Sequence, residues 1–120
     1  MFYTYNQNNS GGRFHSDDRV AEYVIIEANA ADEADIRAMD VGIYFDGVRE
    51  GRDCGCCGDR WHQAYGDGTL EPEIYGEDPA EAESFKKNDQ TPYCHVYYLD
   101  GSVKSYTYGK RHRKSGKAKS

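Results

Sequence analysis

A run near the middle of the chain constrains the fold more than any other, because it gathers potential metal ligands. Residues 53–62, DCGCCGDRWH, hold three of the four cysteines, a histidine and the only tryptophan. Cys54 and Cys57 have the spacing of a zinc knuckle, in which two thiolates bend back onto one metal ion. The glycine that follows lets backbone N–H groups approach the sulfur atoms. The run therefore predicts a zinc-knuckle loop, which would staple a domain with a small core.

A closed tetrahedral zinc site needs two ligands besides those thiolates. The candidates are His62, Cys94, His95 and His15. We predict a structural zinc site formed by Cys54, Cys57, His62 and Cys94. Cys54 with Cys56 is the alternative pair, which leaves one thiol spare.

Three other interpretations of the same run stay open. The thiols can pack as small apolar groups in a glycine-flanked turn. A Cys-x-x-Cys redox site is weaker, because such sites open a helix and GDRWHQ does not clearly do so. An open metal site at Cys54, Cys57 and His62 that holds a water would make the protein an enzyme.

Charge divides the chain into an acidic body and a basic tail. The 120 residues predict one domain at 1–108. Residues 109–120 carry six basic residues and no acid, which leaves 9 basic against 21 acidic residues in the body, a net charge of −12. We expect a solvated, disordered tail that contacts nucleic acid only weakly. The body is a poor partner for DNA or anionic lipid.

The location of the protein follows from its apolar runs and cysteines. The chain has no apolar run that could span a membrane and no signal peptide, since MFYTY leads straight into polar residues. Four cysteines without a secretory signal favour a reducing compartment. We therefore expect a cytoplasmic protein without a membrane partner.

The pattern of apolar residues predicts an α+β fold with a small, mainly antiparallel sheet of about four to five strands and two short helices. Residues 19–28 form the clearest strand, because they are rich in β-branched side chains. Further strands are expected at 1–6, 43–45, 93–99 and 102–108. Residues Cys94, Val96 and Tyr98 alternate along one of them and should share a face.

Helix and turn signals complete this prediction. The first helix is expected at about 30–41, with Asn29 as N-cap and Gly42 just beyond its end. The second is expected at about 79–87, since proline suits the first helical position and lysines end the stretch. Asp100 and Gly101 predict a type I′ turn between the last two strands.

Two stretches carry groups suited to a ligand. Arg60 offers a planar donor and Trp61 a stacking face, which together suit a nucleobase or a phosphate-bearing ligand. The alternative is that Trp61 is a core residue and Arg60 pairs with a neighbouring aspartate. Near the N-terminus, Tyr5, Asn6 and Asn8 can wrap a polar small molecule. The alternative there is a surface connector.

Several segments in order resemble a family of short uncharacterised proteins of tailed bacteriophages, a domain of unknown function. They are VAEYVIIEA at 20–28, the helix rich in acids and alanine, GIYFDGV at 42–48 and DCGCCGDRW at 53–61. The resemblance covers about residues 1–76, and the CxCCGxRW-like run is its most specific element. It implies a phage-encoded accessory protein in the cytoplasm of a bacterial host cell, without carrying over an activity or a ligand.

We expect a non-enzymatic binding protein, because the chain has no Ser-His-Asp or His-Glu-x-x-His pattern. Its concrete form is an antagonist of a host defence that sequesters a nucleotide-derived signal or blocks a host protein, alone or as a homo-oligomer. The acidic body suits a basic host protein better than a phosphate ligand, unless arginines cluster. The alternative is a structural zinc-binding module whose basic tail contacts nucleic acid.

Overall fold

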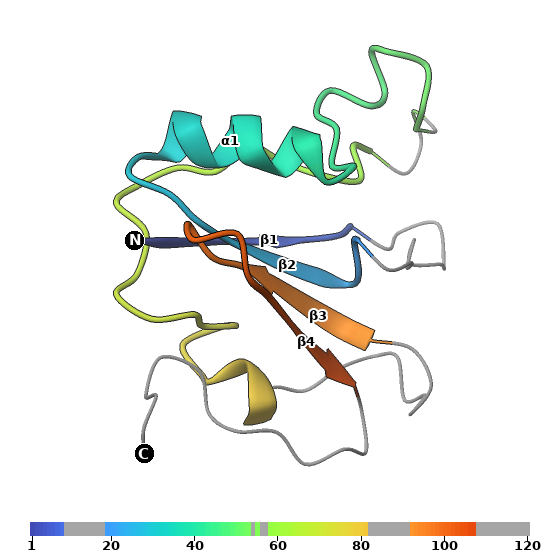
Figure 1. The fold of residues 1–120 in the computed structure, drawn as a ribbon. Helices are drawn as coiled ribbons and strands as arrows, with labels where there is room; N and C mark the ends of the chain where they lie inside the picture. The colour runs from blue at the N-terminus through green and yellow to red at the C-terminus, as the bar shows by residue number, and fades with distance from the viewer. Residues whose placement is uncertain (9–18, 54, 56–57, 82–91, 108–120) are drawn as a thin grey trace, which may run out of the picture.

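The computed structural model describes residues 1–8, 19–53, 55, 58–81 and 92–107 (Figure 1). Its elements are β1 (Phe2–Asn6), β2 (Tyr23–Glu27), α1 (Ala31–Asp40), the 3-10 helix η1 (Pro79–Glu81), β3 (Pro92–Tyr97) and β4 (Val103–Thr107). The described part thus has one four-stranded sheet and one α-helix, which confirms the α+β class. No helix in these ranges is long and apolar enough to cross a membrane.

The strands lie in the order β1-β2-β3-β4, so β1 and β4 are the edges of the sheet. β1 pairs antiparallel with β2, and β3 pairs antiparallel with β4. β2 and β3 run parallel, with Tyr23 opposite Cys94. A parallel pair needs a long crossover connection, and the chain between these two strands contains α1. The sheet is therefore mixed.

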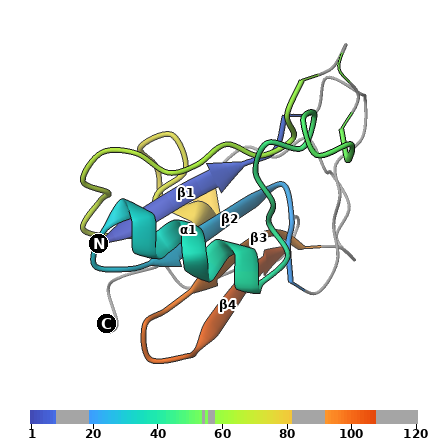
Figure 2. The same ribbon diagram turned by 90° about the horizontal axis from the view of Figure 1, so that it is seen from above.

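Apolar residues cover both faces of the sheet and form two cores. The helix-side core packs against α1, which lies over the middle of the sheet in Figure 2. Its buried members are Tyr3, Tyr5, Val20, Val24, Ile26, Ala28, Ala34, Ala38, Ile43 and Trp61. The η1-side core lies on the opposite face and is built from Phe2, Tyr23, Ile25, Ile74, Tyr93, Cys94, Val96 and Tyr106.

The ends of α1 explain two wrong predictions, Asn29 as the N-cap and a strand at 43–45. The helix begins after Ala30 rather than after Asn29, whose side chain instead bonds Glu33 within the helix. At the other end, the N–H groups of Gly42 and Ile43 bond carbonyls of the last turn in a Schellman motif, and Gly42 adopts φ 112°. Ile43 thus closes the helix and enters the helix-side core, so the strand predicted at 43–45 does not form.

The C-terminal hairpin forms as predicted, but its turn is of another type. The N–H of Tyr98 bonds the carbonyl of Ser102, which leaves a three-residue loop. Gly101 has φ 92°, and Asp100 is not among the residues with positive φ, so a type I turn followed by a left-handed glycine replaces type I′. Two bonds from Ser102 hold the Asp100 carboxylate and lower its pKa.

The second predicted helix is described only at its start. Pro79 opens η1, a single 3-10 turn, and residues 82–87 lie outside the described residues. On β3 the predicted alternation is confirmed, since Cys94, Val96 and Tyr98 all belong to the η1-side core or pack against it.

Candidate functional site: a groove along the edge of β1

The outer edge of β1 has a hydrogen-bonding direction that can be assigned residue by residue. Met1 and Gln7 bond toward the β2 side, at Ala28 and Glu22. Backbone groups of successive residues in an antiparallel pair face opposite ways. The N–H and C=O groups of Phe2, Thr4 and Asn6 therefore point away from β2, to the edge of the sheet.

Two backbone contacts close this edge at its ends. Phe2 exchanges both hydrogen bonds with Thr69, each at 2.8 Å, and the Asn8 N–H donates to the carbonyl of Arg60 at 2.8 Å. Between these contacts, residues 60–69 run beside β1 but at the level of α1 (Figures 1 and 2), and Ala64 bonds Asp35 of that helix. The outward backbone groups of Thr4 and Asn6 receive no hydrogen bond from any residue that the structure describes.

One carboxylate holds the helix-side wall, residues 62–69, next to α1. Asp35 Oδ1 accepts the N–H of Ala64 at 2.9 Å and the hydroxyl of Tyr5 at 2.8 Å. Burial and then this bond raise the pKa of Tyr5 above its ordinary value of 10.0. A single side chain of α1 therefore fixes both the wall and the strand beside it.

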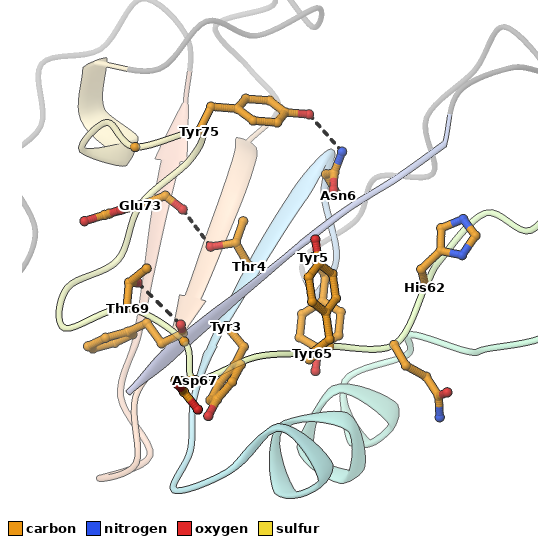
Figure 3. Close-up of a pocket in the computed structure, with 15 residues that line it drawn as sticks. Tyr3, Thr4, Tyr5, Asn6, His62, Tyr65, Asp67, Thr69, Glu73 and Tyr75 are labelled. Atoms are coloured by element: carbon orange, nitrogen blue, oxygen red, sulfur yellow. Dashed lines mark hydrogen bonds between the residues drawn. The ribbon is translucent and has the colours of Figure 1, made fainter.

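The η1-side wall, residues 73–76, is bonded to β1 through side chains. Thr4 Oγ1 donates to the carbonyl of Glu73 at 2.6 Å, and Asn6 Nδ2 donates to the hydroxyl of Tyr75 at 3.0 Å (Figure 3). Ile74 and Glu77 exchange both backbone bonds around a tight turn. Tyr75 takes the left-handed conformation there, with φ 52°.

Between the two walls lies a pocket of about 460 Å³, within the size range of small-ligand sites. Asp67 and Glu73 are among its lining residues, and none of the described lining residues is a lysine or an arginine. Tyr65 and Tyr75 also line it, and their side chains are 89% and 78% exposed. Exposed tyrosines of this kind are typical of binding surfaces.

Three of the residues predicted from the sequence line this groove. They are Tyr5 and Asn6, from the predicted ligand set, and His62, from the predicted zinc set. His62 is exposed, and Figure 3 shows it beyond Tyr5 on the helix-side wall. Asn8 stands at the end of the groove, where its side-chain amide donates to the carbonyl of Asp59 at 3.2 Å.

The other two predicted ligand residues serve the fold. Trp61 is 2% exposed and lies within the helix-side core, so protein contacts occupy its ring. The Arg60 N–H donates to Asp53 Oδ2 at 2.8 Å, and its guanidinium donates to Gln7 at 3.0 Å. This arrangement matches the alternative stated from the sequence, a core tryptophan beside a paired arginine.

The structure separates the described members of the predicted zinc set. Cys94 is fully buried in the η1-side core on β3, whereas His62 lies at the edge of β1 near α1. Burial raises the pKa of the Cys94 thiol. Cys54, Cys56 and Cys57 lie outside the described residues. In the remaining ranges, no three His, Cys, Asp or Glu side chains are placed to hold a metal ion.

The sequence pattern did not single out the residues that build the walls. Thr4, Asp35 and Glu73 act through bonds to residues at least 29 positions away, which no local pattern reveals. Gly76 is the one local cue for a wall: a glycine suits the second position of a two-residue turn, where Tyr75 and Gly76 both have positive φ.

Comparison with protein-family models gives a match over residues 1–116 to the Domain of unknown function (DUF7296). The chain belongs to this family. The match extends past residues 1–76 through the C-terminal hairpin and most of the basic tail. No curated protein and no solved structure matches the chain.

Proposed function

We propose that this member of the DUF7296 family is a non-enzymatic binding protein that holds a basic segment of another protein in the groove along β1. In this proposal it is a phage-encoded accessory protein. It acts in the cytoplasm of the bacterial host cell and blocks a host protein whose basic segment it holds.

The lining of the groove carries the proposal. Asp67 and Glu73 contribute negative charge, and the body around them has a net charge of −12. Complementary potentials speed encounter and select partners, so a surface of this kind favours lysine- and arginine-bearing segments. The exposed rings of Tyr65 and Tyr75 add faces for cation–π contacts.

A nucleotide-derived ligand has less support, because it would need a cluster of cations. The described arginines are instead engaged one by one: Arg19 with the Asp40 carbonyl, Arg37 with the Tyr98 carbonyl, Arg49 with Asp46, Arg52 over the Tyr44 ring, and Arg60 with Asp53. Among them, only Arg52 and Arg60 share a neighbourhood, around Tyr44 and Asp53, and there the Asp53 carboxylate opposes their charge. Blocking of a basic protein therefore ranks above sequestration of a phosphate-bearing signal.

The test is a calorimetric titration of the full chain with three probes. They are the blocked peptide acetyl-Lys-Lys-Val-Lys-Lys-Val-amide, which as a strand carries lysines on both faces, its counterpart with Glu in place of Lys, and ATP. We expect binding of the lysine peptide alone, with an affinity that falls as salt rises. Binding of ATP but not of the lysine peptide would overturn the proposal.

A variant pair assigns the binding to the groove. The double change Asp67→Asn and Glu73→Gln should lower the affinity for the lysine peptide about tenfold, because it removes the negative charge of two lining residues. Glu50→Gln removes one exposed carboxylate outside the groove, and we expect an unchanged affinity.

A further inference from the structure

We propose that the bound segment is extended and adds to β1 as a fifth strand at the sheet edge. This inference rests on the proposed function and specifies how the groove holds its ligand. Its basis is the pair Thr4 and Asn6, whose outward backbone groups receive no bond from the described residues. Such unpaired groups are a template for another strand.

The length of the open edge sets what can bind. Phe2 and Asn8 carry the two closing contacts, and the five residues between them make a separation of about 20 Å for an extended chain. Within that span, Thr4 and Asn6 can each exchange two hydrogen bonds with an added strand. A segment of a few residues therefore fits between the closed ends, with up to four backbone bonds.

The two walls then receive the side chains of the added strand. Successive side chains of a strand point to opposite faces, so they would alternate between the helix-side wall and the η1-side wall. Asp67 belongs to the first wall and Glu73 to the second, and each wall carries one exposed tyrosine. Lysine or arginine stems can pack on these rings, and their charged ends gain from the negative charge of the two lining residues.

Charge also selects the occupant. Pairing of β1 with β1 of a second copy would bring two bodies of net charge −12 together along their acidic grooves. Like charges placed across an interface are unfavourable. A basic segment of a partner protein is complementary on both walls and is the occupant we infer.

Two substitutions at one position separate backbone recognition from side-chain recognition. Thr4→Pro removes the outward N–H, and the β1–β2 ladder keeps its bonds because that N–H faces away from β2. Thr4→Val removes only the hydroxyl, which both variants lose. Because both variants lose the hydroxyl bond to Glu73, the comparison is between them: we expect Thr4→Pro to bind the lysine-valine peptide about tenfold more weakly than Thr4→Val does.

Amide hydrogen exchange on the full-length wild-type chain gives a second measurement that does not depend on a variant folding. The amides of Thr4 and Asn6 should exchange freely without peptide and slow at least about tenfold at saturating peptide. The amide of Tyr5 faces β2 and is already protected, so its exchange is the internal control.

The outcomes separate this inference from the proposed function. Peptide that binds but leaves the Thr4 and Asn6 amides unprotected, with equal affinities for Thr4→Pro and Thr4→Val, would overturn strand addition and leave the function in place. Absence of any binding by the lysine peptide would overturn both. Sedimentation of a dimer that Thr4→Pro dissociates would assign the edge to a second copy and overturn the inference that a basic segment of a partner occupies it.

Discussion

At the scale of single residues, the groove depends on a few side chains that connect distant segments. Asp35 is the clearest of them, because one carboxylate oxygen accepts bonds from both Tyr5 and Ala64. Hydrogen bonds to a charged group are stronger than neutral ones, and an unpaired buried hydroxyl is costly. The position of the helix-side wall therefore depends on this one residue.

We expect Asp35→Ala to lower the free energy of unfolding by about 2 kcal/mol, since it removes both bonds and leaves the Tyr5 hydroxyl without its partner. Urea unfolding measures the loss. Asp40→Ala is the matched control on the same helix, because its exposed carboxylate lies at the negative end of the helix dipole. That change should be neutral or slightly stabilising. Equal losses in the two variants would contradict this role of Asp35.

At the scale of elements, the groove exists because residues 60–69 meet β1 at both ends and leave it in between. Gly68 makes the Thr69 end of this segment possible. It has φ 74°, and a Cβ there would lie 2.8 Å from the carbonyl oxygen of Phe2. Gly101 in the hairpin has φ 92°, but a Cβ there would meet open space. Both glycines thus have a left-handed backbone, but only at Gly68 would a side chain clash with neighbouring atoms.

Alanine substitutions at these glycines should therefore have different costs. We expect Gly101→Ala to destabilise the fold by about 1 kcal/mol, through the left-handed backbone alone. Gly68→Ala should cost about 1–3 kcal/mol more, because the Cβ pushes Phe2 and Thr69 apart. Thermal unfolding compares the two variants. Only Gly68→Ala should also lower the affinity for the lysine-valine peptide. A lower peptide affinity of Gly101→Ala would be inconsistent with this explanation.

At the scale of the whole molecule, buried tyrosines form a large part of both cores. Burial raises the pKa of five of them above 10.0: Tyr5, Tyr23, Tyr44, Tyr93 and Tyr106. For Tyr93 the value rises to about 12. The folded state therefore keeps these phenols protonated at a pH where the unfolded chain releases their protons.

This difference gives the sign of the pH dependence. The unfolded chain binds fewer protons than the native state above pH 10, so the free energy of unfolding must fall as pH rises. Each raised tyrosine contributes up to about 1.4 kcal/mol per pH unit between its unfolded and folded pKa. We expect stability to decline steeply above pH 10. Urea titrations from pH 8 to pH 12 measure this decline.

The control for the alkaline loss is Tyr93→Phe, which removes one shifted phenol together with its bond to the Pro79 carbonyl. Its stability should fall less steeply between pH 10 and pH 12 than that of the wild type. An identical slope in the two proteins would show that Tyr93 does not contribute to the pH dependence.

The sequence by itself determined the elements whose signals are local. β2 follows from its β-branched residues, α1 from its acids and from Gly42, and the C-terminal hairpin from Asp100 and Gly101. Alternation along β3 also placed Cys94 and Val96 on one face correctly. These features depend on neighbours within a few positions, so the pattern of residues suffices to predict them.

Only the tertiary structure decided the pairing of the strands and the existence of the groove. The parallel contact between β2 and β3 and the bond from Thr4 to Glu73 join positions about 70 residues apart. Tertiary contacts also override a local signal at Ile43: its bond to the end of α1 and its place in the core outweigh its strand propensity. A binding edge forms where distant segments fail to pair with a strand, and that is a property of the packed chain.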